Sequence, residues 1–463
     1  MPYIGTSPSQ GVRRVHTYTA TANQTSFSGA GAEGATLSYK DSNFVDVYQN
    51  GVKLGDADYT ATSGTAIVLG TGATVSDLVV VVAYDVFSAA DTVSKADGGQ
   101  FDGNVTFAGD IIKSTAGTSN FAAGVNAGNS IASGGNYNVV IGDEAGTALT
   151  TGDGNVAIGF EALKTEDANG QNIAIGYRAL KLQDGGAEVA NTAIGYLAGS
   201  NIDLGRENVL VGANVGDSLT HADYNVAIGN GSLGADTLGH KSTAVGYASL
   251  NAQNFATSTD SHNTAVGYFS GVSITTGIHN TLIGSGAGDA LTDADSNVAV
   301  GSSSLTSDTK GSKNTAVGHS ALEAMNHSTA TTSYNTAIGS DSAKAITTGV
   351  QNTIVGSLAG AALTDADYNT AIGYAALDAD TLGSKSTAMG YNALGSQNFT
   401  TATDTNNTAV GYQAGASIST GISNTFIGNQ TGQNSTDTDY NTAIGDRALY
   451  LSLIHISEPT RPY

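Results

Sequence analysis

The chain of 463 residues contains no cysteine, only 4 proline residues and few charged residues, which make up 12% of the total. Without cysteine, neither a disulfide framework nor a thiolate metal site can form. The chain does not open with a basic stretch followed by an apolar one, and its longest apolar run, residues 78–84, is far too short to span a bilayer. We therefore expect no membrane insertion and no encoded export signal.

Basic residues are also scarce, with 17 Lys and Arg against 40 Asp and Glu, so the formal net charge is −23. The basic residues are scattered and form no stripe that could follow a phosphate backbone. We expect no nucleic-acid partner, and the negative charge favours solubility. Glycine, in contrast, is abundant at 61 residues, which indicates a β-rich repeat protein rather than an ordinary globular core.

One five-residue motif recurs eighteen times between Asn138 and Gly445: Asn, a β-branched residue, a small or apolar residue, Ile or Val, and Gly. Successive motif glycines are mostly 17 residues apart, with occasional steps of 19 or 21. A repeat of this length predicts an all-β fold in which residues 131–450 form a parallel β-solenoid, with one rung per repeat. With neighbouring strands about 4.8 Å apart, about 18 rungs would make a rod on the order of 85 Å long.

The rung lengths themselves repeat in blocks of four. Gly229, Gly301, Gly373 and Gly445 are each 72 residues apart, and the steps within a block are 17, 21, 17 and 17. The third motif residue is usually Ala but is larger in every fourth rung, at Leu210, Leu282, Ile354 and Phe426. The residue four places after the motif Gly follows the same block, so the duplicated unit was four rungs long.

The strand within each motif is apolar on both faces. Ala265 and Val266 point to opposite sides of an extended chain, as do the equivalent pairs in other rungs. One face can fill the interior of the coil, but the other needs a cover that a single thin solenoid does not contain. We therefore expect lateral association of several copies of the chain, with rows of Ala allowing close approach.

The first motif residue is Asn except at Ser242 and Ser386. Stacked Asn side chains can hydrogen-bond along the axis and satisfy the backbone of the bends, so we predict a structural ladder rather than a catalytic site. The motif Gly is expected at a bend or close approach where a Cβ would clash. The ladder comprises Asn138, Asn155, Asn172, Asn191, Asn208, Asn225, Asn263, Asn280, Asn297, Asn314, Asn335, Asn352, Asn369, Asn407, Asn424 and Asn441.

The 21-residue rungs add four residues each, within segments 251–262, 323–334 and 395–406. We expect all three insertions to bulge from one edge, four rungs apart. Insertions in solenoids often lie on the binding face, so they are candidate receptor loops, although bulges without a partner are the alternative. The candidate contact residues are Asn254, Phe255, Asn326, His327, Asn398 and Phe399.

Other residue patterns suggest chemistry only weakly. The pairs Asp293/Asp295 and Asp365/Asp367 offer oxygen ligands for Ca²⁺ but are equally typical of Asx turns, so we predict neither a metal site nor a cofactor. Tyrosines that follow the motif Gly could stack against a sugar or simply against one another. The eight His residues have no repeated Ser, Cys or carboxylate partner, so we expect no catalytic triad and no enzyme activity.

The two ends of the chain differ from the repeat. Residues 1–92 predict a small β-sandwich with a hairpin at Asn50-Gly51 and strands at 66–69 and 78–84. Residues 93–130, rich in Gly, Asp and Ser, are expected to form a neck. Residues 451–463 break the repeat and resemble the translation of a sequencing-library adapter, so we expect them not to be native and the natural gene to continue.

Two parts of the chain, the repeat and the N-terminal region, resemble known families. The repeats at 191–196 (NTAIGY) and 263–268 (NTAVGY) resemble the head repeats of trimeric autotransporter adhesins. The segments at 3–8 (YIGTSP), 45–54 (VDVYQNGVKL) and 91–95 (DTVSK) resemble the attachment end of tail-fibre proteins of marine tailed phages. The first resemblance implies a trimer of left-handed parallel β-rolls. The second implies a virion protein whose solenoid is commonly followed by a chaperone domain.

Together these resemblances imply a homotrimeric phage tail fibre. Its N-terminal domain would dock to phage tail or baseplate proteins, and its rod would contact a host surface glycan or outer-membrane receptor. Three alternatives remain open at this stage: a bacterial surface adhesin, a tailspike polysaccharide depolymerase, and an ice-binding array built on repeated Thr residues such as Thr315, Thr336 and Thr353.

Overall fold

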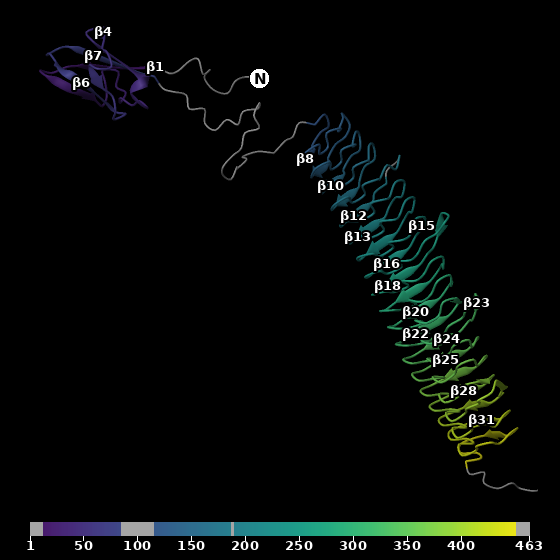
Figure 1. The fold of residues 1–463 in the computed structure, drawn as a ribbon. Helices are drawn as coiled ribbons and strands as arrows, with labels where there is room; N and C mark the ends of the chain where they lie inside the picture. Colours follow the sequence, from purple (N-terminus) through teal and green to yellow (C-terminus); the bar gives the residue numbers. More distant parts are fainter. Residues whose placement is uncertain (1–12, 85–114, 187–188, 451–463) are drawn as a thin grey trace, which may run out of the picture. The chain divides into compact units, whose positions relative to one another are not determined.

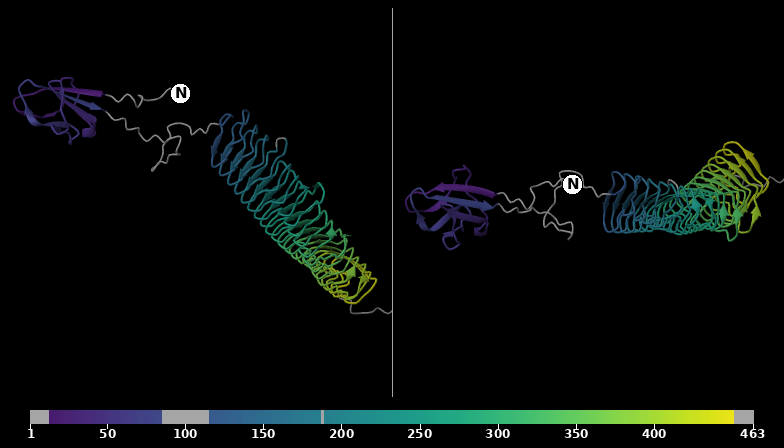
Figure 2. Two further views of the ribbon diagram at one scale, coloured as in Figure 1. Left: turned by 45° about the horizontal axis from the view of Figure 1, so that its top comes forward. Right: turned by 90° about the horizontal axis from the view of Figure 1, so that it is seen from above.

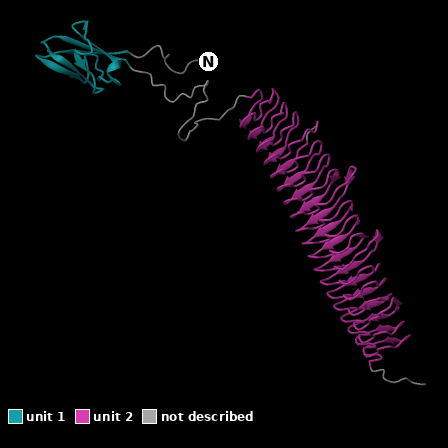
Figure 3. Cartoon of the chain, in the orientation of Figure 1, with its two compact units in different colours: residues 1–108 teal, residues 109–463 magenta. Residues whose placement is uncertain are grey.

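The computed structural model describes residues 13–84, 115–186 and 189–450 (Figure 1). The chain divides into two compact units, residues 1–108 and 109–463, which are coloured separately in Figure 3. Most of the predicted neck and the whole of the predicted adapter segment, 451–463, lie outside the described residues. Within the described residues, no helix has the length and apolar character needed to cross a membrane.

The N-terminal unit contains two antiparallel sheets, and its core draws on both of them. Val47 and Val81 from the first sheet are buried in one cluster with Phe27 and Ile67 from the second. The β-sandwich predicted for this part of the chain is therefore confirmed. The first sheet has the order β1 (Arg13–Thr19), β7 (Leu78–Tyr84), β3 (Val45–Gln49) and β4 (Val52–Lys53), the second has the order β2 (Gln24–Ser28), β6 (Ala66–Ala73) and β5 (Tyr59–Thr60), and a 3₁₀ helix, η1 (Ser42–Phe44), precedes β3.

The predicted hairpin joins β3 to β4. Asn50 and Gly51 at its tip have φ angles of 49° and 83°, and a two-residue turn of type I′ needs positive φ at both of these positions. The Asn50 side chain also braces the turn, because its Oδ1 accepts a hydrogen bond from the Leu78 N–H at 2.9 Å. This prediction is confirmed.

The second unit is a parallel β-solenoid in which nineteen three-residue strands form a single sheet, one strand per rung (Figures 1 and 2). Neighbouring strands pair in register, so that the Asn-to-Gly motifs lie directly over one another. The solenoid prediction is confirmed. The strands are β8 (Phe121–Ala123), β9 (Val139–Ile141), β10 (Val156–Ile158), β11 (Ile173–Ile175), β12 (Thr192–Ile194), β13 (Val209–Val211), β14 (Val226–Ile228), β16 (Thr243–Val245), β18 (Thr264–Val266), β19 (Thr281–Ile283), β20 (Val298–Val300), β22 (Thr315–Val317), β24 (Thr336–Ile338), β25 (Thr353–Val355), β26 (Thr370–Ile372), β28 (Thr387–Met389), β30 (Thr408–Val410), β31 (Thr425–Ile427) and β32 (Thr442–Ile444).

The solenoid begins one rung earlier than the sequence predicted. Strand β8 pairs in parallel with β9, with Phe121 opposite Val139. The assignment of residues up to 130 to the neck is therefore wrong, because at least residues 121–130 belong to the first rung. The segment 120–124 reads NFAAG, so it lacks the β-branched residue and the Ile or Val of the motif.

The middle residue of each strand points into the coil, and its two neighbours point outward. In β12, Ala193 is fully buried whereas Ile194 is 37% exposed. The expectation that rows of Ala would lie between associating chains is therefore wrong, because these rows line the interior. The outward rows consist of the first and third strand residues.

The interior is filled by matching large and small residues across the coil. Leu282 in β19 is fully buried, and a Cβ added to Gly271 or Gly288 would lie 2.7 Å and 2.8 Å from its methyl carbons. In two of the three rungs of each block whose strand carries Ala, the position of these glycines holds a buried Leu, as at Leu250 and Leu305, whereas in the third, which precedes the rung with the large residue, it is Gly or Ala, as at Gly271. The four-rung pattern in the sequence is thus a pattern of interior volume.

The three insertions pair with the rung that precedes them, and do not simply bulge. Figure 1 shows β15 and β23 away from the row of three-residue strands. Each insertion contributes one short strand that runs parallel to a short strand of the previous rung. The pairs are β15 (Gly239–His240) with β17 (Thr259–Asp260), β21 (Gly311–Ser312) with β23 (Thr331–Thr332), and β27 (Gly383–Ser384) with β29 (Thr403–Asp404).

Candidate functional site

The Asn side chains form the predicted ladder along the interior edge of the strands. The Oδ1 of Asn263 accepts a hydrogen bond from the backbone N–H of Asn280 at 2.9 Å, and the Oδ1 of Asn280 accepts one from Asn297 at 3.0 Å. The Nδ2 of Asn280 donates to the carbonyl of Ala294 at 2.8 Å. Asn280 therefore satisfies the backbone of its own rung and of the next, and most of the other buried Asn residues make the same two contacts, whereas the Nδ2 groups of Asn172 and Asn314 donate to side chains. Asn120 extends this ladder by one rung, because its Oδ1 accepts from the Asn138 N–H at 2.8 Å.

The two serines in the ladder are accommodated by a glutamine from the same rung. At the first of them, Gln253 donates from Nε2 to Ser242 Oγ at 2.9 Å, and its Oε1 accepts from Asn263 Nδ2 at 2.9 Å. Gln397 makes the same two contacts around Ser386. Gln183 makes the equivalent contacts to Asn172 and Asn191, each at 3.0 Å, so the glutamine bridge also forms where the ladder residue is Asn.

A buried carboxylate lies seven residues after the motif Gly in one rung of each block: Glu166, Asp236, Asp308 and Asp380. Asp236 accepts hydrogen bonds from Gln253 Nε2 at 2.6 Å and from the Gly239 N–H at 3.0 Å. Burial raises the pKa of both Asp236 and Glu166 above the usual range of a carboxyl group, although these hydrogen bonds oppose the shift. The sequence patterns did not single out these residues, although the recurrence of Asp236, Asp308 and Asp380 every 72 residues was a signal that could have found them.

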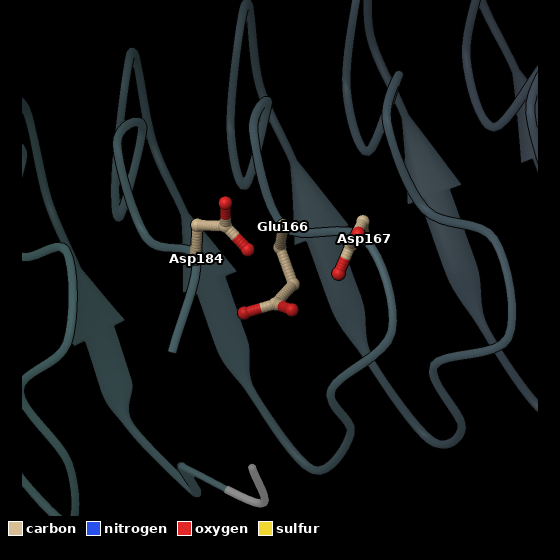
Figure 4. A group of neighbouring side chains, drawn as sticks. All are labelled: Glu166, Asp167 and Asp184. Carbon is tan, nitrogen blue, oxygen red and sulfur yellow. The ribbon is translucent and has the colours of Figure 1, made fainter. Parts of the chain in front are cut away.

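Glu166 lies between Asp167 and Asp184, and one oxygen of each lies within 4.8 Å of the others (Figure 4). Among the described residues, this is the one group of three carboxylate or imidazole side chains close enough to share a metal ion. However, Glu166 already accepts hydrogen bonds from Asn169 Nδ2 at 2.6 Å and from Gln183 Nε2 at 3.3 Å. Its oxygens therefore act as acceptors for neighbouring side chains within the solenoid.

The aspartates predicted as weak metal candidates instead bind the backbone or neighbouring hydroxyls. Asp295 Oδ1 accepts from the Ile278 N–H and Asp367 Oδ1 from the Val350 N–H, both at 2.8 Å. Asp293 accepts from Thr292 Oγ1 at 3.0 Å, and Asp365 accepts from the hydroxyl of Thr348. Their oxygens do not converge on one point, which favours the Asx-type alternative.

The predicted contact residues of the insertions differ in exposure. The side chains of Asn254, Asn326 and Asn398 are exposed, as a receptor contact requires. Phe255, His327 and Phe399 are buried, with 5%, 5% and 7% exposure. The prediction that these three contact a receptor is wrong for the described fold. They lie under the root of each insertion, where Thr237, Thr309 and Thr381 of the preceding rung donate hydrogen bonds to their carbonyl groups.

The tyrosines after the motif Gly stack on one another along the axis. In the run Tyr374, Tyr391 and Tyr412, successive ring centroids are 5.6 Å and 5.2 Å apart, and the planes differ by 12° and 13°. Both faces of the Tyr391 ring are thereby covered by neighbouring rings, and Tyr374 and Tyr412 each have one face covered. A sugar that stacks on a ring needs an open face, so the geometry favours the purely structural alternative.

The outward face of the long sheet carries no charged residue from β9 to β32. In these eighteen strands the first and third residues are Val, Ile, Thr or Met without exception. Ile194, Ile228, Ile338 and Ile427 are among the exposed large apolar side chains of this face. On a chain with a net charge of −23, an uncharged stripe along the whole solenoid is a marked departure from the rest of the surface.

Comparison of the chain with protein-family models, with curated proteins and with solved structures found no match in any of the three.

Proposed function

We propose that this protein is a homotrimeric tail fibre of a phage, a structural virion protein that attaches the particle to its host surface and has no enzymatic role. In this proposal the solenoids of three copies associate side by side, and the N-terminal sandwich docks to tail or baseplate proteins. The observation that carries the proposal is the uncharged, β-branched outward face of the long sheet. The sequence resemblances to tail-fibre proteins and to adhesin head repeats support a trimeric fibre over other rod-shaped oligomers.

The size of this face suits an interface between copies. Its two outward rows extend over a rod on the order of 85 Å long and, with side chains, roughly 10 Å wide, so the face covers on the order of 850 Å². A stable interface between two proteins buries about 800 Å² on each partner, so each copy would bury a comparable area in total, divided between its two neighbours in the trimer. Acidic side chains on the faces of two identical copies would repel each other, and this stripe carries no charged side chain.

Attachment would depend on multivalency. The exposed parts of the insertions are rich in Ser and Thr, with the exposed Asn254, Asn326 and Asn398 near their starts. Three parallel copies would present each insertion three times, so weak contacts with a host glycan or outer-membrane receptor would add through avidity.

Analytical ultracentrifugation of the full chain tests the association. We expect the mass of a trimer, and we expect Ile338→Glu to shift the protein to monomer because it places a charge on the outward face. Thr329→Glu, at an exposed position in an insertion, is the matched control and should leave the trimer intact. A monodisperse monomer of the unmodified chain at micromolar concentration would contradict the proposal. New reducing ends after incubation with host polysaccharide would instead support a depolymerase.

One observation favours a second candidate function, ice binding. From β22 to β32, eight consecutive strands begin with Thr, and these residues pair in register across the sheet. A regular row of hydroxyl and methyl groups on an exposed sheet could order water. Thermal hysteresis in a monomeric preparation, abolished by Thr353→Lys, would favour this function over the fibre.

A further inference from the structure

The three 21-residue rungs differ at two buried positions that face one carboxylate. In the first and third of these rungs, Asp236 and Asp380 are matched by Gln253 with Phe255 and by Gln397 with Phe399. In the middle rung, Asp308 is matched by Met325 and His327, and all three of these side chains are buried. The chain thus contains two copies of one arrangement and a single copy of another.

In the two matching rungs, the carboxylate is fully hydrogen-bonded by neutral groups. Gln397 donates from Nε2 to Asp380 Oδ2 at 2.6 Å, as Gln253 does to Asp236. The other oxygen of Asp380 accepts the backbone N–H of Gly383 at 3.1 Å and of Phe399 at 3.0 Å. The second of these bonds ties the start of the insertion to the preceding rung.

In the middle rung, Met325 cannot donate a hydrogen bond, so Asp308 Oδ2 is buried without a partner. Asp308 Oδ1 still accepts the backbone N–H groups of Gly311 and His327, each at 3.1 Å. The His327 Nδ1 lies 3.5 Å from this same oxygen, too far for a well-formed hydrogen bond, and the backbone of Thr348 also favours the protonated imidazole. An imidazole and a carboxylate therefore face each other in a site that is almost closed to solvent.

The other charged groups around this site are occupied elsewhere. On the preceding rung, the Lys310 ammonium lies 3.9 Å from Asp293, and the Lys310 backbone N–H lies 3.4 Å from Asp308 Oδ1. On the following rung, the Lys344 ammonium pairs with Asp341 at 3.0 Å and with Glu323 at 3.3 Å. Thr347 and Thr348, which lie alongside the start of the insertion, carry no charge. His327 is thus the side chain placed to neutralise Asp308.

We propose that the insertion at 323–334 is held by a proton-dependent latch, in which protonated His327 pairs with Asp308, and that the insertions at 251–262 and 395–406 lack this dependence. A neutral imidazole keeps one N–H but no charge, so it leaves the buried carboxylate poorly compensated. The loop whose N–H is bound by that carboxylate then opens more often. This inference does not depend on the fibre proposal.

The direction of the effect follows from the pKa of His327. The Asp308 carboxylate raises this pKa above the usual value near 6.5, and burial of the imidazole opposes the shift. A group whose pKa is higher in the folded state contributes its stabilisation at low pH. The stabilisation is complete below about 6.5 and is lost as the pH rises through the raised folded-state pKa.

Hydrogen–deuterium exchange of the full chain between pH 5.5 and 8.5 tests the latch, with rates corrected for the intrinsic pH dependence of exchange. We expect protection of residues 326–334 to fall on the order of tenfold across this range. Protection of 398–406, which contains no His, should stay unchanged, so this loop serves as the control within the same molecule. Residues 254–262 serve only for comparison, because His240 Nε2 lies 2.7 Å from Ser258 Oγ in that loop. Equal pH profiles for the three loops would overturn the proposal, and this comparison needs no variant.

Two double variants sharpen the test. Met325→Gln with His327→Phe converts the middle rung to the arrangement of its neighbours and should remove the pH dependence of residues 326–334. Gln253→Met with Phe255→His makes the converse change and should transfer that dependence to 254–262. A pH dependence that persists in the first double variant would contradict the role of His327.

Discussion

At the scale of single residues, the motif glycine meets two requirements at once. Gly284 has a φ of 139°, and a Cβ at this position would lie 2.5 Å from the carbonyl oxygen of Gly301 on the next rung. Side chains rarely adopt this backbone conformation, and the close approach leaves no room for one. The same combination recurs along the sheet, which explains why the glycine is retained in every rung.

We predict that Gly284→Ala destabilises the solenoid by more than about 2 kcal/mol, because backbone strain and the clash with Gly301 add together. Gly154→Ala is the control, since Gly154 also has a positive φ, 67°, but has no atom within 4 Å of an added Cβ. This control should cost about 1 kcal/mol. Guanidinium unfolding measures both variants, and equal losses would show that the close approach is unimportant.

The ladder asparagines predict a second effect at this scale. Asn280→Ala removes the acceptor of the Asn297 N–H and the donor to the Ala294 carbonyl, and both groups are buried. With about 1–3 kcal/mol for each unpaired group, we expect a loss of about 2–6 kcal/mol in thermal unfolding. Asn326→Ala, at an exposed side chain, should change stability by less than about 0.5 kcal/mol. Comparable losses for the two variants would contradict a structural ladder.

At the scale of the rung, the size of the middle strand residue and the size of the residue four places after the motif Gly are matched to fill the interior. We predict a loss of about 2–5 kcal/mol for Leu282→Ala, which leaves a cavity. Gly288→Leu alone should cost about 1–3 kcal/mol, because the new side chain meets Leu282. The double variant reproduces the pairing of Ala299 with Leu305 in the next rung and should recover at least about 1 kcal/mol of the summed losses. Strict additivity in chemical unfolding would argue against volume matching.

The insertions show the same principle for polar groups. In the first and third insertions, a glutamine hydrogen-bonds the buried Asp, and the next buried position holds Phe255 or Phe399. In the middle insertion, Met325 replaces the glutamine and His327 replaces the phenylalanine. Two changes within one rung thus compensate around one buried charge. The middle insertion therefore differs from the other two in its buried residues as well as in its exposed ones.

At the scale of the whole solenoid, pH is expected to act through buried acids. Burial raises the folded-state pKa of Glu166, so stability falls as the pH rises from about 4.5 through that raised value and is constant above it. We predict a higher melting temperature near pH 5 than near pH 7.5. Partial protonation of acidic groups at pH 5 also contributes, because it weakens the repulsion within a chain whose net charge is −23. Glu166→Gln should flatten this dependence.

Glu161→Gln is the matched control for that measurement. Lys164, Lys181 and Arg178 lower the pKa of Glu161 to about 2, so this group stays ionised between pH 5 and 7.5. Its stabilisation is lost only as the pH falls from about 4.5 to about 2, outside the measured window. An equal flattening in both variants would show that the slope comes from net charge alone.

Much of this architecture was predictable because it depends on backbone geometry repeated at a fixed period. The rung length, the pairing in register, the glycine at the close approach and the asparagine ladder all follow from one recurring motif. The hairpin at Asn50-Gly51 follows from local turn chemistry in the same way. The first rung was missed because residues 120–124 keep only Asn, Ala and Gly of the motif, yet β9 supplies the pairing partner that forms the strand.

The sequence by itself determined that this chain coils into a β-solenoid of four-rung blocks, since periodicity along the chain survives folding unchanged. Only the tertiary structure decided which side of each strand faces inward. An extended strand offers Ala on one side and Ile or Val on the other with equal ease, and the direction in which the coil closes selects between them. The same closure buried Phe255, His327 and Phe399 beneath their insertions and left the uncharged sheet face outside.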